Sequence, residues 1–123
     1  MMKVLLVDDE HEFVSTLAER LLMRGIEADD VTSGKDAILK ATERSYDVVV
    51  LDLKMAGMGG IETMEKIRKI RPEAGFIILT GHGDRQEHEK ALSAGARFHL
   101  IKPLNIEVLI EKIKLAGAPK EES

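Results

Sequence analysis

Hydrophobic positions along the chain alternate between short apolar runs and longer stretches with helical spacing. The short runs are Val4–Val7, Val48–Leu51, Phe76–Leu79 and Phe98–Ile101, and a more polar one covers Ile26–Thr32. Apolar runs rich in β-branched residues are typical of strands that are buried on both faces, as in a parallel sheet. The acidic residues within the polar run favour an edge strand of the same sheet.

Each of these runs is followed by a stretch with an apolar residue at every third or fourth position, the spacing of an amphipathic helix. We expect helices over Glu10–Arg24, from Ser33 onward, and over Ile61–Arg71, Asp84–Ala94 and Asn105–Leu115. Gly25 is placed to cap the first helix, and Ser33 with Asp36 resembles a capping box at the start of the second. In the first helix, Leu21 and Leu22 are both expected on the buried face.

Five strand-then-helix units predict an α/β fold: a single doubly wound parallel sheet of five strands with helices on both faces. The chain has 123 residues, enough for one hydrophobic core but not for two. We take residues 1–116 as the folded domain and residues 117–123 as a polar C-terminal tail or the start of a linker.

Composition narrows the classes of function. The 18 basic and 22 acidic residues give a net charge of −4, which argues against nonspecific binding of nucleic acid or of a membrane surface. There are no cysteines, so disulfides, thiolate metal sites and cysteine nucleophiles are excluded. The apolar start, Met1–Val7, is too short for a signal peptide or a membrane span, and we expect a cytoplasmic protein.

Polar side chains follow four of the expected strands, where the strands end. They are Asp8 and Asp9, Asp52, Thr80 and Lys102. Because the carboxyl ends of parallel strands meet at one edge of the sheet, these residues should converge there. Three neighbouring carboxylates repel one another unless they bind a cation, and oxygen ligands suit a hard divalent ion such as Mg²⁺. The lysine and the hydroxyl favour an anion next to it, so the edge has the parts of a phosphoryl-transfer site.

Four short motifs carry a resemblance to a known family. Leu6–Glu10, Val50–Leu53, Leu79–Gly81 and Ile101–Pro103 together resemble the receiver domain of two-component response regulators. No single motif is specific, but all four occur in order and the resemblance covers essentially the whole chain. It implies a flavodoxin-like sheet with the strand order 2-1-3-4-5.

The resemblance implies a role for each acidic residue. Asp52 would be the phosphoacceptor, which takes a phosphoryl group from the phosphohistidine of a sensor histidine kinase or phosphotransfer protein. Asp9 would bind Mg²⁺, or Mn²⁺ in its place, together with Asp8, Asp52 and the backbone carbonyl of Lys54. The chain would catalyse only its own phosphorylation and dephosphorylation, and would not turn over a metabolite.

It also implies a switch. Lys102 would contact the phosphoryl oxygens, and the Thr80 hydroxyl would swing inward to bind them. In the family this swing is coupled to an aromatic residue three positions before the lysine, which here is His99. The motion reshapes the face of the fourth helix, fifth strand and fifth helix, where an effector domain, a downstream protein or a second copy in a phosphorylation-linked homodimer would bind. Direct binding of nucleic acid by this domain is not expected.

The sequence departs from the family pattern at several tuning positions. His99 is smaller and more polar than the usual switch aromatic, and Ala56 replaces a proline in the loop after the acceptor. Lys54 and His82 occupy the positions two beyond Asp52 and Thr80 that tune dephosphorylation, with Gly81 in the same segment.

Three other functions remain as alternatives. The first is a receiver-like interaction module that works without phosphorylation, which His99 and Ala56 favour. The second is an aspartyl-phosphate phosphohydrolase, whose pattern has a second aspartate where this chain has Lys54. A flavodoxin-like nucleotide binder is disfavoured because no glycine-rich phosphate loop follows the first strand. The four histidines have no metal-ligand spacing and are interpreted as surface or tuning residues.

Overall fold

The computed structural model describes residues 1–81 and 85–118, and within them strands and helices alternate as expected. In chain order they are β1 (Lys3–Val7), α1 (His11–Met23), β2 (Glu27–Val31), α2 (Gly34–Glu43), β3 (Val48–Asp52), α3 (Gly60–Ile70), β4 (Gly75–Thr80), α4 (Arg85–Ser93), β5 (Phe98–Ile101) and α5 (Ile106–Gly117). The last helix continues two residues beyond the predicted Leu115. Most of the expected C-terminal tail, 119–123, lies outside the described residues.

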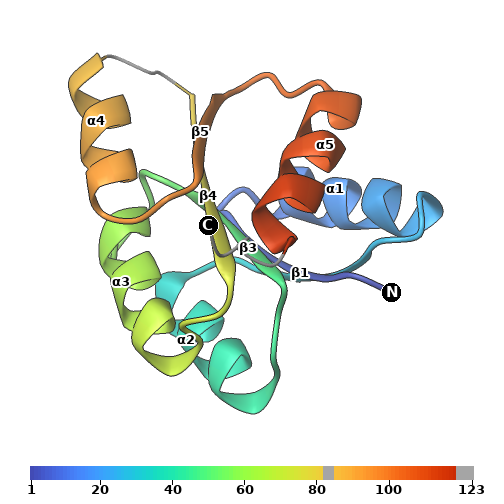
Figure 1. The fold of residues 1–123 in the computed structure, drawn as a ribbon, viewed down its shortest axis with the longest axis horizontal. Helices are drawn as coiled ribbons and strands as arrows, with labels where there is room; N and C mark the ends of the chain where they lie inside the picture. The colour runs from blue at the N-terminus through green and yellow to red at the C-terminus, as the bar shows by residue number, and fades with distance from the viewer. Residues whose placement is uncertain (82–84, 119–123) are drawn as a thin grey trace, which may run out of the picture.

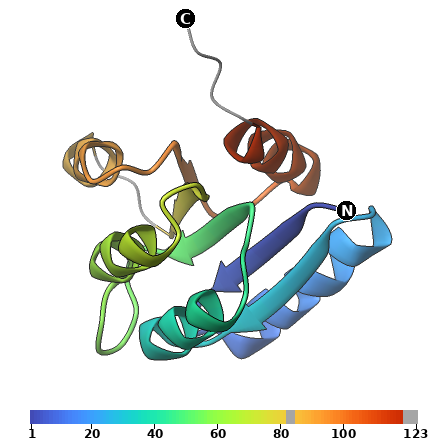
Figure 2. The same ribbon diagram turned by 60° about the horizontal axis from the view of Figure 1, so that its bottom comes forward.

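The five strands form one parallel sheet in the order β2-β1-β3-β4-β5. Figure 2 shows β1 and β3 as neighbouring arrows that point the same way. The fold class and the strand order are therefore confirmed, and the polar run over Ile26–Thr32 does contain an edge strand. Since all strands are parallel, their carboxyl ends lie along one edge.

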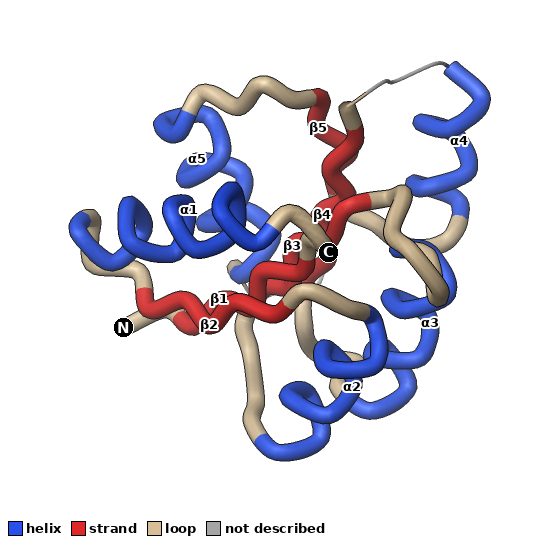
Figure 3. The backbone as a smooth tube through the Cα atoms, turned by 180° about the vertical axis from the view of Figure 1, so that it is seen from behind, coloured by secondary structure: helices blue, strands red, loops and turns tan. Residues whose placement is uncertain are grey.

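Helices cover both faces of the sheet. α1 and α5 lie on one face, and α2, α3 and α4 lie on the other (Figures 1 and 3). Side chains of a strand alternate between the two faces, so Leu5 packs beneath α2 and α3 while Leu6 packs beneath α1 and α5. Both leucines are almost completely buried, and burial of each contributes roughly 1.5–3 kcal/mol to stability.

Local sequence signals fix several helix ends. The Ser33 hydroxyl accepts a hydrogen bond from the Asp36 N–H at 3.1 Å, as the capping box predicts. Gly25, just after α1, has a φ of +80°, a conformation that glycine adopts without steric cost.

The prediction that Leu22 is buried is wrong. Its side chain is 59% exposed whereas Leu21 is fully buried, because a helix turns by about 100° per residue and Leu22 has left the buried face.

The loop after β3 folds back tightly beneath Asp52. The Gly60 N–H donates to the Leu53 carbonyl at 2.9 Å, and a Cβ on Gly60 would collide with the backbone carbonyl oxygen of Asp52. Glycine therefore lets α3 begin directly against the end of β3. This close contact helps to fix the backbone position of Asp52.

None of the helices in the described part of the chain is both long enough and apolar enough to cross a bilayer.

Candidate functional site

The parallel sheet places the expected polar residues along its carboxyl edge. Asp8 directly follows β1, Asp52 ends β3, Thr80 ends β4, and Lys102 directly follows β5. These four strands are neighbours in the sheet. Asp8, Asp52 and Thr80 are buried. Burial is unusual for the carboxylates of Asp8 and Asp52 and indicates that they have specific partners.

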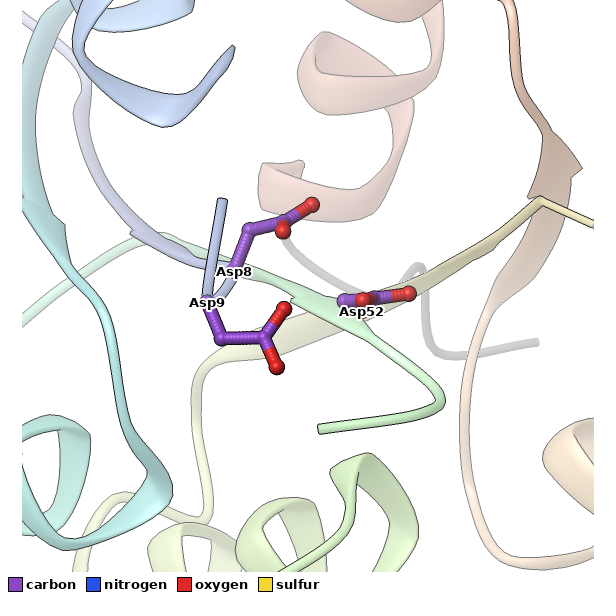
Figure 4. A group of neighbouring side chains, drawn as sticks. All are labelled: Asp8, Asp9 and Asp52. Carbon is purple, nitrogen blue, oxygen red and sulfur yellow. The ribbon is translucent and has the colours of Figure 1, made fainter. Parts of the chain in front are cut away.

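Three carboxylates form a cluster at this edge (Figure 4). Asp8, Asp9 and Asp52 each offer an oxygen, and these oxygens all lie within 4.8 Å of one another. Asp9 is exposed to solvent and also accepts a hydrogen bond from the Ala56 N–H at 3.2 Å. A donor set of carboxylate oxygens with one exposed member fits a hard divalent cation that keeps some of its water ligands.

Lys102 is bound to the most buried of these carboxylates. Its Nζ lies 2.6 Å from Asp8 Oδ2 and 3.5 Å from a Glu10 carboxylate oxygen. It also lies 4.4 Å from the centroid of the Phe13 ring. Burial alone would lower the pKa of Lys102, but the hydrogen bond and charge of Asp8 outweigh it and the pKa is raised, so the ammonium stays charged. Sequence reasoning missed Glu10 and Phe13 as contacts, although both lie on the first turn next to Asp8 and Asp9.

Among the described carboxyl groups, Asp52 is the one whose pKa is shifted most. Its pKa is raised from 3.8 to about 6, mainly by burial and then by the charge of Asp8, while Lys102 opposes the shift. Asp9 adds repulsion, and a hydrogen bond from the Lys54 backbone N–H stabilises the carboxylate. Without a cation, the site therefore holds more negative charge than its surroundings compensate.

Lys54, an expected tuning position, forms an ion pair with a residue of α4. Its Nζ lies 3.3 Å from a carboxylate oxygen of Glu87, although the lysine side chain is largely exposed. Sequence reasoning missed Glu87, because nothing in the spacing of residues 54 and 87 links them. Gly81 is exposed just after β4. His82, the other tuning position, lies outside the described residues.

The switch candidate His99 has a partner that the sequence did not reveal. Its Nδ1 lies 3.0 Å from Nδ1 of His88 on α4. Burial lowers the pKa of His99, and the charge of His88 lowers it further. Phe98 packs with the core beneath α1 and α5, so it lies on the opposite face of the sheet from His99.

The comparisons with known proteins agree with this geometry. The family model described as response regulator receiver domain matches residues 4–114. The CpxR homolog of Haemophilus influenzae, a transcriptional regulatory protein, is 37% identical over 93% of this chain and 49% of its own length. The chain spans 27% of another matching transcriptional regulator, so it corresponds to only part of these curated relatives.

Solved structures agree as well. A response regulator receiver domain from Clostridium thermocellum is 34% identical, covers 94% of each chain and has a TM-score of 0.88. The DrrB receiver domain, described as BeF3-activated, is 31% identical over 94% of this chain and 97% of its own, with a TM-score of 0.84. Sequence, fold and strand-edge chemistry lead to the same conclusion: this chain belongs to the family of response regulator receiver domains.

Proposed function

We propose that Asp52 is the phosphoacceptor of this receiver domain. The observation that supports it best is the position of Asp52 at the end of the central buried strand, within 4.8 Å of the Asp8 and Asp9 oxygens. Asp8 is engaged by Lys102, and Asp9 is exposed. Asp52 is therefore a buried carboxylate that lies beside both of the other carboxylates.

In the reaction, an Asp52 carboxylate oxygen attacks the phosphorus of a phosphohistidine on a sensor histidine kinase or phosphotransfer protein. The new O–P bond forms as the P–N bond breaks, and the leaving imidazole takes up a proton. Lys102 offsets charge on the phosphoryl oxygens once it turns from Asp8. Hydrolysis of the aspartyl phosphate returns the chain to the resting state, and no other substrate is turned over.

The carboxylate cluster is proposed to hold Mg²⁺, with Mn²⁺ as a substitute. Asp8, Asp9 and Asp52 would be ligands, together with the backbone carbonyl of Lys54. When bound, the ion would offset the negative charge of the phosphoryl oxygens and the carboxylates. The oxygen-only donor set supports this choice, because nitrogen and sulfur ligands that select transition metals are absent from the described cluster.

The output of the switch is proposed to run through Thr80 and His99 to the face formed by α4, β5 and α5. Ile101 and Val108 on this face are about half exposed, which leaves apolar surface for an effector domain, a downstream protein or a second copy. The curated relatives are transcriptional regulators, and an output of that kind is the one we expect. The proposal places the chain in the cytoplasm, where a kinase could reach it.

The direct test is intact-mass analysis after incubation with acetyl phosphate, with Mg²⁺ or with EDTA. We expect a gain of one phosphoryl group only with Mg²⁺, and loss of that gain on treatment with hydroxylamine, which cleaves acyl phosphates. If phosphorylated kinase as donor also produced no gain, the acceptor proposal would be wrong. The phosphorylation-independent interaction module would then be the better function.

A further inference from the structure

The histidine pair, His88 and His99, joins α4 to the strand that follows it, β5. His88 is an exposed residue of α4, and His99 is a half-buried residue of β5, the edge strand. Their Nδ1 atoms lie 3.0 Å apart, and the ring centroids lie 5.1 Å apart with a tilt of 42°. The rings therefore meet edge to edge through their nitrogens and do not stack. α4 and β5 are in contact, and Figure 1 shows where the two elements lie in the fold.

The register of the sheet places His99 on the same face as Thr80, two residues away along the strand direction. Ile78 pairs with His99 and Thr80 pairs with Ile101. Residues two apart on a strand share a face, so Thr80 and His99 lie on the same face, the one that α4 covers. The other ring nitrogen of His99, Nε2, is buried, and no residue in the described part of the chain hydrogen-bonds to it. Within the described residues, His99 thus has its hydrogen bond to α4 through Nδ1, while its buried Nε2 has no partner.

A hydrogen bond between two Nδ1 atoms has a strict requirement for protons. One nitrogen must carry a hydrogen and the other must offer a lone pair, so the bond exists when both rings are neutral or when one is charged. When both rings are charged, both nitrogens carry hydrogens and the bond is lost. The hydrogen bond therefore survives when one ring of the pair becomes charged and is lost only when the second ring becomes charged as well.

We propose that His88 is a positioning residue for the switch: through its hydrogen bond to His99 it holds α4 against β5 in the resting chain. The bond is lost when both rings are protonated, or when His99 turns inward as Thr80 moves toward the phosphoryl group. The second route rests on the proposed function, whereas the first does not.

The charges around the pair favour the neutral state of His99 near pH 7. Burial keeps the pKa of His99 below its ordinary value, and His88 lowers it further, while Glu87 opposes the shift. The charged side chains of α4 are Arg85, Glu87, Glu89 and Lys90. Glu87 is paired with Lys54, and Glu89 with Arg85. β4, the neighbouring strand, has no charged residue between Gly75 and Thr80. We therefore expect the bond to be intact at neutral pH and lost in acid.

The first test reads the protons directly, by long-range ¹H–¹⁵N NMR of the histidine rings in the metal-free chain. We expect one ring of the pair to carry its proton on Nδ1 at neutral pH. On acidification below the pKa of His99, we expect the α4 amide resonances to shift together. If both rings carried their protons on Nε2, neither Nδ1 could donate, and the proposal would be wrong.

The second test compares three variants in a titration with beryllofluoride and Mg²⁺, followed by the amide resonances of α4 and β5. His88→Ala removes the bond. His88→Asn keeps an amide group at the same distance from the backbone as Nδ1 but does not titrate. Gln86→Ala, at another exposed position of α4, is the matched control. Loss of one net hydrogen bond should let His88→Ala reach the half-point at about two- to tenfold lower beryllofluoride.

We expect Gln86→Ala to match the wild type, and His88→Asn to lie closer to the wild type than to His88→Ala and to respond less to acid. Equal half-points for the wild type and His88→Ala would overturn the proposal. If the wild type did not respond to beryllofluoride at all, the proposed phosphoacceptor function would fail. The ring tautomers and the response of α4 to acid would still decide whether His88 holds α4 against β5.

Discussion

Asp52→Asn is expected to abolish the gain of a phosphoryl group from either acetyl phosphate or phosphorylated kinase. The amide is nearly the same size as the carboxylate but has no anionic oxygen to attack phosphorus. Asp8 is held by Lys102 at 2.6 Å, so it is badly placed to replace Asp52 as nucleophile. Intact-mass analysis should show no detectable phosphorylated species, a loss of at least about a hundredfold in rate on the scale of removed nucleophiles.

A control for this variant lies on the same edge of the sheet. Asp30 is an exposed carboxylate near the carboxyl end of β2, outside the cluster of Asp8, Asp9 and Asp52. Asp30→Asn should be phosphorylated at the wild-type rate. Phosphorylation of Asp52→Asn at an undiminished rate would assign the acceptor to another carboxylate, with Asp9 the first to examine because it is exposed.

The same substitution should make the metal-free chain more stable at neutral pH. The pKa of Asp52 rises from 3.8 to about 6 on folding, mainly through burial and then through repulsion by Asp8. Each unit of pKa corresponds to about 1.4 kcal/mol, so ionising this carboxyl costs the folded state up to about 3 kcal/mol. Asp52→Asn removes that cost. We expect a free energy of unfolding higher by about 1–3 kcal/mol at pH 7.5 in EDTA, measured by urea denaturation.

The stability difference between Asp52→Asn and the wild type should depend on pH. Between pH 3.8 and about 6, the folded state binds the Asp52 proton and the unfolded state does not, so stability from this group falls as the pH rises. The difference between variant and wild type should therefore be small near pH 4, grow through this window and level off above it. A variant that was less stable than the wild type at pH 7.5 would contradict this account.

Mg²⁺ should reverse the order of stability, so that the wild type has a higher free energy of unfolding than Asp52→Asn. A ligand that binds only the folded state stabilises it in proportion to the logarithm of its concentration over the dissociation constant. Millimolar Mg²⁺ should raise the stability of the wild type, because the ion offsets the repulsion among the three carboxylates. It should raise the stability of Asp52→Asn less, because that variant has lost one ligand.

Much of the fold could be predicted because local signals and the global pattern agree in this chain. Val48–Leu51 is apolar on both faces and is the central strand; Ile26–Thr32 is polar and contains an edge strand. The converging strand ends follow from parallel pairing alone, so Asp8, Asp52, Thr80 and Lys102 could be grouped without coordinates. The predicted burial of Leu22 was wrong because a wide apolar stripe in the sequence does not show where the buried face of a helix ends.

The partners of the site residues could not be predicted in the same way. Glu87 reaches Lys54 and His88 reaches His99 across the gap between α4 and its neighbours, and no sequence spacing encodes these contacts. They depend on how α4 is rotated about its axis, and Ala91, the one buried residue of this helix, gives the sequence little signal for that rotation. The Asp8–Lys102 bond likewise joins residues 94 positions apart, and the grouping of charges does not say which carboxylate the lysine selects.

The burial of β3 also determines where motion can occur. All five of its residues are buried, whereas every residue of β5 is at least partly exposed. Amides in a central, fully buried strand exchange with solvent only through the rarest openings, and those of a short edge strand exchange through local ones. The proposed acceptor, Asp52, therefore lies on a strand that opens rarely, and the proposed output face includes an edge strand that opens more easily. If the proposed output route is right, a signal from Asp52 acts on a face whose strand, β5, opens at a lower cost in free energy than β3 does.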